Sequence, residues 1–502
     1  MTKRSKYICL FSLLFQAIFA SAIFAQKNTE KIVFRLAGVF GNNMVLQRET
    51  DAAVWGYAKP GATVTIKPTW SEEAVTTTAN EDGKWKTTIA TPEAGGPFQI
   101  GFHSNNFKIN LKNVMSGEVW ICSGQSNMQW KMKGFGLKQF QAAVKKANQP
   151  NIRLGYVPQV LSLEPQEDIR VGWTACSPKT VLQFSAVAYF FANKLDQELD
   201  GVPIGLVSTS WGGSAAQAWV EKEALLEQCP EFGEVYDEYP ATIEKLGVLH
   251  PNRKRPKGIS QSMPSALYNN MIRPIVPFTC RGVIWYQGES NVKDPAQYQR
   301  IFPTLIKSWR DEWGQGDFPF YYVQIAPYHY RNEELPTALL RESQFKALEI
   351  ENTGMVVTMD IGDPTNIHPK RKQPVGERLA LLALAHEYGQ TDLVYSGPQY
   401  VAHEVVNGGI QIEFTHTGSG MTSRDGKPLS HFTIAGADQV FHPASAAIEN
   451  DTIVVSSPQV AKPVAVRFAW GNADEPNLMN QEGLPSSSFR TDDWPFENSN
   501  EK

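Results

Sequence analysis

A serine at position 126 follows a short apolar run with the composition of a buried strand. Residues 119–122 read Val-Trp-Ile-Cys, and small and polar residues then lead through Ser126 and Asn127 to a helix-compatible segment that begins at Met128. A serine on a strand-to-helix turn presents its hydroxyl above the sheet edge, where N–H groups at the helix start can hold an oxyanion. Ser126 is therefore a candidate nucleophile, although serine and asparagine are also favoured helix caps, and the local sequence alone favours that structural role.

A histidine with acidic neighbours follows a later predicted strand. His368 lies on a loop after the strand-like run 355–359, and Asp360 and Asp363 lie within the eight residues before it. Ester hydrolysis needs a nucleophile, a base that takes its proton and a partner that orients the base. Ser126, His368 and one of the two aspartates supply that set. A lone histidine is more often a surface or core residue, so the assignment depends on the other turns.

Two further turns offer groups that could stabilise an oxyanion. The pair Gly212-Gly213 and the run from Gln287 to Glu289 each follow a predicted strand. A backbone N–H of Ser126, one from Gly212 or Gly213, and the Gln287 amide could all act as donors. Taken singly, the glycine pair could be a tight turn and Glu289 a solvated charge. In an open parallel sheet, however, the carboxyl ends of the strands share one crevice, and the agreement of four such turns favours catalysis.

The segments that connect these turns alternate between strand and helix. Strands are predicted at residues 202–209, 281–286, 320–325 and 355–359. Helices are predicted at residues 186–199, 215–226, 265–272, 298–313, 339–349 and 376–388. This alternation is typical of a parallel sheet with helices on both faces, so residues 114–390 are predicted to form an α/β domain.

Short strand-like segments on either side of this region predict two accessory β-modules. Residues 26–113 contain closely spaced strand patterns without helical periodicity, with an Asp-Gly turn at position 82, and indicate a β-sandwich-like module. Residues 391–496 return to strand patterns, with an Asp-Gly hairpin turn predicted at position 425, and indicate a second β-rich module. Neither module carries a candidate catalytic cluster.

The first 25 residues have the pattern of a signal peptide. A basic start is followed by an apolar stretch and then by small residues, namely Lys3, Arg4 and Lys6, residues 8–18, Ala20-Ser21-Ala22 and Ala25. We therefore expect an exported mature protein, periplasmic or secreted, with no membrane attachment once this segment is removed.

Composition and charge exclude some partners. The chain has 502 residues, a formal net charge of -4 and 42% hydrophobic residues, which gives no reason to expect nucleic acid or an anionic membrane as a partner. Beyond the predicted signal peptide the cysteines are Cys122, Cys176, Cys229 and Cys280. They allow two disulfides in three connectivities, or buried free thiols, and no Cys or His spacing indicates a metal site.

Several blocks of sequence resemble the sialate O-acetylesterase family, within the SGNH-type hydrolases. The opening block comprises residues 117–120 and 124–128, and the later blocks comprise residues 184–189, 210–214, 268–272 and 282–291. The histidine block comprises residues 360–363 and 367–369 with Lys372, and the closing motif comprises residues 483–485 and 488–492. Together these motifs are highly specific, and they cover nearly the whole mature chain.

The resemblance implies a fold, an activity and a set of roles. The family fold is a flavodoxin-like three-layer α/β/α sandwich, and the family activity is removal of O-acetyl groups from sugars without a metal or cofactor. Ser126 corresponds to the nucleophile and His368 to the general base. A glycine of the Gly212-Gly213 turn and Gln287 correspond to oxyanion-hole donors.

Two positions depart from the family pattern. SGNH enzymes often carry an aspartate three positions before the histidine, where this chain has Thr365. We predict that Asp363 orients His368, with Asp360 or a backbone carbonyl as the alternatives. Gln287 also stands where many relatives present an asparagine, so the third oxyanion donor is a separate question.

The predicted function is an exported serine esterase that deacetylates O-acetylated carbohydrate through an acetyl-serine intermediate. Residues 124–128 read Gly-x-Ser-x-Met rather than Gly-x-Ser-x-Gly, which argues against an α/β-hydrolase nucleophile elbow. The alternatives are a non-catalytic carbohydrate-binding protein and a glycosidase that uses Glu289 with another carboxylate. The acetylated sugar (sialate, xylan, pectin-type or other), the disulfide pairing and the oligomeric state are left open.

Overall fold

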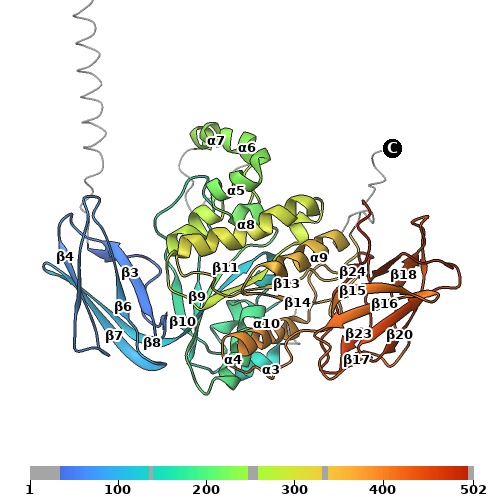
Figure 1. Cartoon of the computed structure of the whole chain (residues 1–502). Coiled ribbons are helices and arrows are strands. Elements are labelled where there is room, and N and C mark those ends of the chain that lie inside the picture. Colours follow the sequence, from blue (N-terminus) through green and yellow to red (C-terminus); the bar gives the residue numbers. More distant parts are fainter. Residues whose placement is uncertain (1–33, 135–139, 247–257, 331–336, 496–502) are drawn as a thin grey trace, which may run out of the picture. The chain divides into compact units, whose positions relative to one another are not determined.

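The computed structural model describes residues 34–134, 140–246, 258–330 and 337–495 (Figure 1). These residues divide into two compact units. The first consists of residues up to 37, 53–89 and 99–111, and the second of residues 38–52, 90–98 and 112 onward. The predicted signal peptide lies outside the described residues.

The first unit is built from β-strands. One sheet has the order β1 (Arg35–Leu36), β3 (Asp51–Tyr57), β6 (Lys84–Ala90), while β4 (Thr63–Pro68) pairs antiparallel with β5 (Val75–Thr78) and β7 (Gly95–Ser104). Buried and exposed residues alternate along β4, as expected for strands with one face on a core. The apolar side chains of this unit include Val64, Ile66, Trp85 and Phe102, all buried.

The second unit contains the sheet that carries the candidate site. Its strand order is β10 (Gly172–Ala175), β9 (Ile152–Tyr156), β11 (Ile204–Ser210), β8 (Phe107–Gly124), β12 (Gly282–Tyr286), β13 (Phe320–Val323), β14 (Thr353–Val356). The short strand β2 (Val45–Gln47) pairs parallel with β8 at residues 115–117. All neighbours from β9 to β14 are parallel, whereas β10 runs antiparallel to β9. The predicted parallel sheet is thus mixed at one edge, because no helix lies between β9 and β10 to return the chain for parallel pairing.

The register of the central strands brings their carboxyl ends to one level. Gly124 at the end of β8 pairs with Ser210 of β11 and with Tyr286 of β12. Tyr286 pairs in turn with Val323 of β13, which pairs with Val356 of β14. The loops that follow these strands therefore start at the same sheet edge.

Helices cover both faces of this sheet (Figure 1). On one face α4 (Ala186–Glu198) packs against α10 (Lys372–His386), and residues of both helices share one hydrophobic core with the β8 residues Trp120 and Cys122. On the other face α8 (Pro295–Trp313) lies beside α9 (Thr337–Lys346), and Trp309 of α8 meets Trp285 of β12 with their rings 5.9 Å apart. The predicted three-layer α/β/α architecture of the SGNH type is confirmed.

Some helix boundaries differ from the predictions for local reasons. The helix predicted at 298–313 begins at Pro295, because Asp294 caps it by accepting a hydrogen bond from the Gln297 N–H. The helix predicted at 215–226 is split into η3 (Ala216–Trp219) and α5 (Lys222–Gln228), with Glu221 as the N-cap of α5. Of the helix predicted at 265–272, only the π-turn η5 (Tyr268–Ile272) forms.

The remaining helical elements are short. They are α2 (Ser126–Gln129), α3 (Gln141–Lys146), α6 (Gly233–Asp237), α7 (Tyr239–Leu246), η2 (Val181–Gln183), η4 (Pro230–Phe232), η6 (Arg273–Ile275), η7 (Glu289–Asn291) and η8 (Ala347–Glu349). None of the described helices has both the length and the apolar composition needed to cross a membrane.

The last part of the second unit is β-rich, in agreement with its strand patterns. One sheet has the order β15 (Gln399–Val406), β16 (Gly409–Thr415), β21 (Thr452–Ser456), β20 (Ser445–Glu449). Another has the order β19 (Phe441–Pro443), β18 (Phe432–Ala435), β22 (Ala465–Phe468), β24 (Phe489–Arg490), and β17 (Met421–Ser423) pairs with β23 (Leu478–Asn480).

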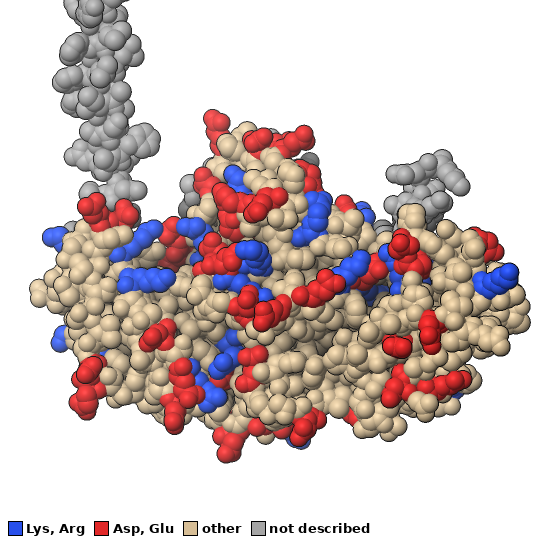
Figure 2. Space-filling view, in the orientation of Figure 1, with Lys and Arg blue, Asp and Glu red and all other residues tan. Residues whose placement is uncertain are grey.

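Cysteine and charge placement complete the description. Cys122, Cys176, Cys229 and Cys280 are buried free thiols, which decides between the two alternatives that the sequence leaves for them. On the face shown in Figure 2, acidic and basic side chains of the described residues are interspersed.

Candidate active site

Ser126 is the first residue of the short helix α2, which begins directly after β8. The turn is tight because Gly124 adopts φ +134°, and a Cβ atom there would lie 2.2 Å from the carbonyl oxygen of Tyr286. The N–H of Gln125 donates to that same carbonyl. As the first helical residue, Ser126 has a backbone N–H with no acceptor inside its own helix. The turn thus presents both the hydroxyl and the N–H of Ser126 at the sheet edge.

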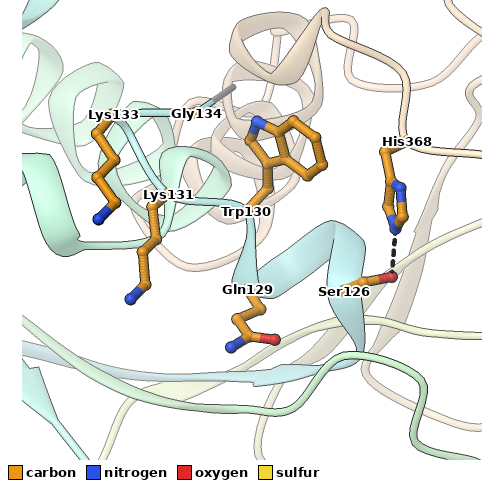
Figure 3. A pocket seen from close by; sticks show the side chains of 7 residues that line it. All are labelled: Ser126, Gln129, Trp130, Lys131, Lys133, Gly134 and His368. Atoms are coloured by element: carbon orange, nitrogen blue, oxygen red, sulfur yellow. Dashed lines mark hydrogen bonds between the residues drawn. The ribbon is translucent and has the colours of Figure 1, made fainter. Parts of the chain in front are cut away.

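His368 lies on the loop between β14 and α10, and it reaches the serine across 242 positions of sequence. Its Nε2 atom is 2.9 Å from Oγ of Ser126 (Figure 3). The backbone N–H of His368 donates to the side-chain oxygen of Asn366. The Trp130 ring lies 5.2 Å from the imidazole, at an interplanar angle of 32°. A hydroxyl and an imidazole at this distance can exchange a proton.

The surroundings of the His368 imidazole favour its neutral form. Its burial lowers the pKa of His368, and the charge of Lys372 lowers it further. Only a neutral imidazole can accept the proton of a serine hydroxyl, so both effects favour the form that acts as a base.

Neither aspartate before the histidine bonds to it. The Asp363 carboxylate accepts hydrogen bonds from the N–H and the hydroxyl of Thr365, at 3.0 and 2.7 Å. The Asp360 carboxylate forms a bidentate pair with Arg378, at 2.8 and 2.7 Å. Among the described residues, Nδ1 of His368 has no hydrogen-bond partner. The structure therefore places the serine and the histidine together as a pair, and no carboxylate of the described residues bonds to the far side of the ring.

The glycine turn contacts the serine. The Gly212 N–H donates to Oε1 of Gln129 at 2.7 Å, and a Cβ atom on Gly212 would lie 3.3 Å from the Cβ of Ser126. Gly213 takes the positive φ of +72° that completes the turn. Gly212 thus lies beside Ser126, and its N–H has the Gln129 side chain as its acceptor.

Gln287 lies deeper than its predicted role requires. Its side chain is fully buried, and its Nε2 atom donates to the Ser214 carbonyl at 3.3 Å and to Oδ1 of Asn291 at 2.7 Å. Both amide hydrogens are therefore used by these groups. Gln287 bonds to the end of the glycine turn at Ser214 and does not donate to the space beside Ser126.

A pocket of about 310 Å³ opens over the serine and the histidine. Its other lining residues are Gln129, Trp130, Lys131, Lys133 and Gly134 (Figure 3). All five follow Ser126 within eight positions, and no motif in the sequence marks them as lining residues. The lining thus includes one tryptophan and two lysines, and the lysine side chains extend away from Ser126 and His368 in Figure 3.

The sequence analysis also did not predict a buried polar cluster beside Ser126 and His368. Asn127 accepts a hydrogen bond from Nζ of Lys372 and donates one to a carboxylate oxygen of Glu289, each at 2.5 Å. Burial raises the pKa of the Glu289 carboxyl. Glu289 is buried against Asn127 and does not line the pocket, so nothing in its placement supports its use as a glycosidase acid.

A parallel sheet with a serine–histidine pair at the carboxyl edge of its strands defines an α/β serine hydrolase of the SGNH type. Residues 116–385 match the family model described as "Carbohydrate esterase, sialic acid-specific acetylesterase". The chain belongs to this family of carbohydrate esterases, and it is a carbohydrate O-acetylesterase.

Individual relatives agree with this assignment. The chain is 31% identical over 409 residues to the sialate O-acetylesterase of Homo sapiens, which covers 73% of each sequence. It is 31% identical over 427 residues to the enzyme of the same name from Mus musculus, which covers 73% of this chain and 76% of the relative. A carbohydrate acetylesterase from Xanthomonas citri has a similar structure, with a TM-score of 0.81, 38% identity and coverage of 92% of this chain and all of that one.

Proposed function

We propose that this enzyme is exported and that it removes O-acetyl groups from carbohydrate through an acetyl-Ser126 intermediate. The observation that carries the mechanism is the 2.9 Å contact between Ser126 Oγ and His368 Nε2. Export rests on the signal-peptide pattern of residues 1–25. The catalytic region of the proposal is residues 114–390.

In the first half-reaction, Ser126 Oγ attacks the acetyl carbonyl carbon while its proton passes to Nε2 of His368. The carbonyl becomes a tetrahedral oxyanion, which the N–H groups of Ser126 and Gly212 stabilise. The Gly212 N–H becomes free for this role when its hydrogen bond to the Gln129 side chain breaks. The intermediate collapses, the C–O bond to the sugar breaks, and His368 returns the proton to the departing sugar hydroxyl.

In the second half-reaction, water attacks the acetyl-serine and gives its proton to His368. Collapse of this second tetrahedral intermediate breaks the bond to Ser126 Oγ, which takes the proton from His368, and releases acetic acid, which ionises to acetate in solution. Asp363 enters the proposal through the loop: its carboxylate holds Thr365 and its carbonyl accepts the Asn366 N–H, which shapes the turn before His368.

Acetate release from a panel of acetylated glycans tests the reaction, with Ser126→Ala alongside. The panel includes O-acetylated sialic acid, xylan and pectin, since the names of the relatives include sialate esterases and a carbohydrate acetylesterase. We expect acetate from at least one glycan and none above background from the variant. Normal activity in Ser126→Ala would overturn the mechanism.

Two further measurements separate the remaining parts of the proposal. A serine-directed fluorophosphonate should label Ser126, and the absence of any label or acetate would favour a non-catalytic carbohydrate-binding protein. The N-terminal sequence of the expressed protein should start near residue 26, and an intact Met1 in a cytoplasmic fraction would refute export.

A further inference from the structure

The residue after the nucleophile and the residue before the base are joined by one amide. The Asn127 side chain donates from Nδ2 to the backbone carbonyl of Ile367, at 3.1 Å. Asn127 directly follows Ser126, and Ile367 directly precedes His368. A shift of this amide therefore changes the distance between Ser126 and His368.

The orientation of the amide is determined by its neighbours. The Ile367 carbonyl can only accept, so it requires the Asn127 nitrogen, and the Asn127 oxygen then accepts from Lys372. Glu289 accepts the second hydrogen of that nitrogen. Asn127 and Lys372 are fully buried and Glu289 is 7% exposed, so water does not compete for these bonds.

Within the part of the chain that the structure describes, the imidazole bonds to no side chain other than Ser126. In the described residues its Nδ1 atom bonds to no group, and both nearby aspartates are committed elsewhere, Asp363 to Thr365 and Asp360 to Arg378. Apart from Ser126, two contacts hold His368 in place: its backbone N–H donates to the Asn366 side chain, and its ring lies against the Trp130 ring.

We propose that Asn127, clamped between Lys372 and Glu289, is the positioning residue that sets His368 against Ser126 in place of an orienting carboxylate. This inference deepens the proposed function and rests on it. Lys372 has a second part in it, because its Nζ lies 5.7 Å from the centroid of the Trp130 ring, which itself lies 5.2 Å from the imidazole, and this places a positive charge beside His368.

The charges around the cluster determine the sign of that second effect. The titratable groups are His368 and Lys372, then Glu289 of η7, and the phenols that face Glu289, namely Tyr286 of β12, Tyr298 of α8 and Tyr330. Burial lowers the pKa of Lys372 to about 7, and Glu289 opposes that shift. Apart from burial, Lys372 is the group that lowers the pKa of His368. Removal of the Lys372 charge should therefore raise the pKa of His368.

Asn127→Leu tests the positioning, because leucine is close to asparagine in shape but cannot bridge the three partners. The rate of Ser126 labelling by a fluorophosphonate is the readout, since it needs no knowledge of the natural sugar. We expect a loss of about 10²-fold in the labelling rate of the folded protein, as for a reacting group displaced by about 1 Å.

Asn480→Leu is the matched control. Asn480 is also fully buried, and its amide donates to the Ser396 carbonyl and accepts from the Leu484 N–H. It should lower thermal stability comparably while the folded protein labels at the wild-type rate. If Asn127→Leu labels as fast as Asn480→Leu, the positioning role is refuted.

Lys372→Met tests the charge effect through the pH dependence of labelling, with the exposed Lys370→Met as control. The midpoint of the acid limb should move to higher pH in Lys372→Met and stay in place in Lys370→Met. A merely structural lysine would lower the rate without moving the midpoint, and that result would overturn the charge effect. If Lys372→Met fails to fold, the comparison of Asn127→Leu with Asn480→Leu still decides the inference. A wild-type enzyme that no phosphonate labels would refute the proposed function itself.

Discussion

Gly212 lies so close to Ser126 that a Cβ atom on the glycine would be 3.3 Å from the Cβ of the serine. The same atom would be 2.9 Å from Oε1 of Gln129, the group that now accepts the Gly212 N–H. Space between Gly212 and the proposed nucleophile is therefore restricted.

Gly212→Ala should lower kcat strongly. The added methyl group displaces either the nucleophile or the N–H that is to hold the oxyanion, and a displacement of about 1 Å costs on the order of 10²-fold in rate. Steady-state kinetics with an acetylated substrate measures the loss. Gly233→Ala is the control, because its Cβ would meet nothing within 4 Å. Unchanged kcat in Gly212→Ala would show that this turn takes no part in catalysis.

The pH dependence of kcat/KM should show a base with a depressed pKa. Burial and Lys372 lower the pKa of His368 below its usual value of about 6.5. Protonation of a base stops catalysis, so activity is at its plateau above this pKa and falls as the pH drops through it. At about pH 6.5 more than half of the plateau should remain. A profile measured with an aryl acetate, which does not ionise in this range, checks this, and a midpoint above 6.5 would contradict it.

The two aspartates of the histidine loop should respond differently to amidation. Asp363→Asn keeps an oxygen that can accept from Thr365, so we expect less than about a threefold loss of kcat, whereas loss of a triad acid costs about 10⁴-fold. Asp360→Asn breaks a buried ion pair with Arg378 and should lower the free energy of unfolding by about 3 kcal/mol. Kinetics and denaturant titration of both variants measure these effects. A loss above about 10³-fold in Asp363→Asn would mean that Asp363 reaches His368 during turnover.

The sequence predicts the five strands from β11 across β8 to β14, and it places Ser126 and His368 after two of them. Ser126, Gly212 and His368 each follow an apolar run, and the common register of the strand ends brings such positions together whatever their separation along the chain. The sequence analysis missed both β9 and β10. The antiparallel pairing of β10 with β9 depends on the path of the chain between them, which leaves no periodic signal.

What the sequence could not supply is the direction of individual side chains. Asp363 has the right type and spacing for an orienting acid, but it closes a local turn onto Thr365, a competition typical of aspartate in loops. Gln287 follows its strand as predicted but turns inward to Asn291. The partners of Asn127 come from two distant segments, so its bridging role is visible only in three dimensions.

The two lysines beside the pocket should favour acidic sugars. Lys131 and Lys133 line the pocket over Ser126, and each ammonium can attract a substrate carboxylate by about 1 kcal/mol, or about fivefold in kcat/KM. The double variant Lys131→Met, Lys133→Met should therefore slow deacetylation of an O-acetylated sugar acid by about 10-fold to 30-fold at low salt. Deacetylation of a neutral acetylated sugar should change little, and added salt should reduce the difference because it screens exposed charges.

The double variant Lys145→Met, Lys146→Met, on α3, is the control because neither residue lines the pocket. Equal losses on acidic and neutral substrates would show that the lysines shape the pocket without selecting for charge.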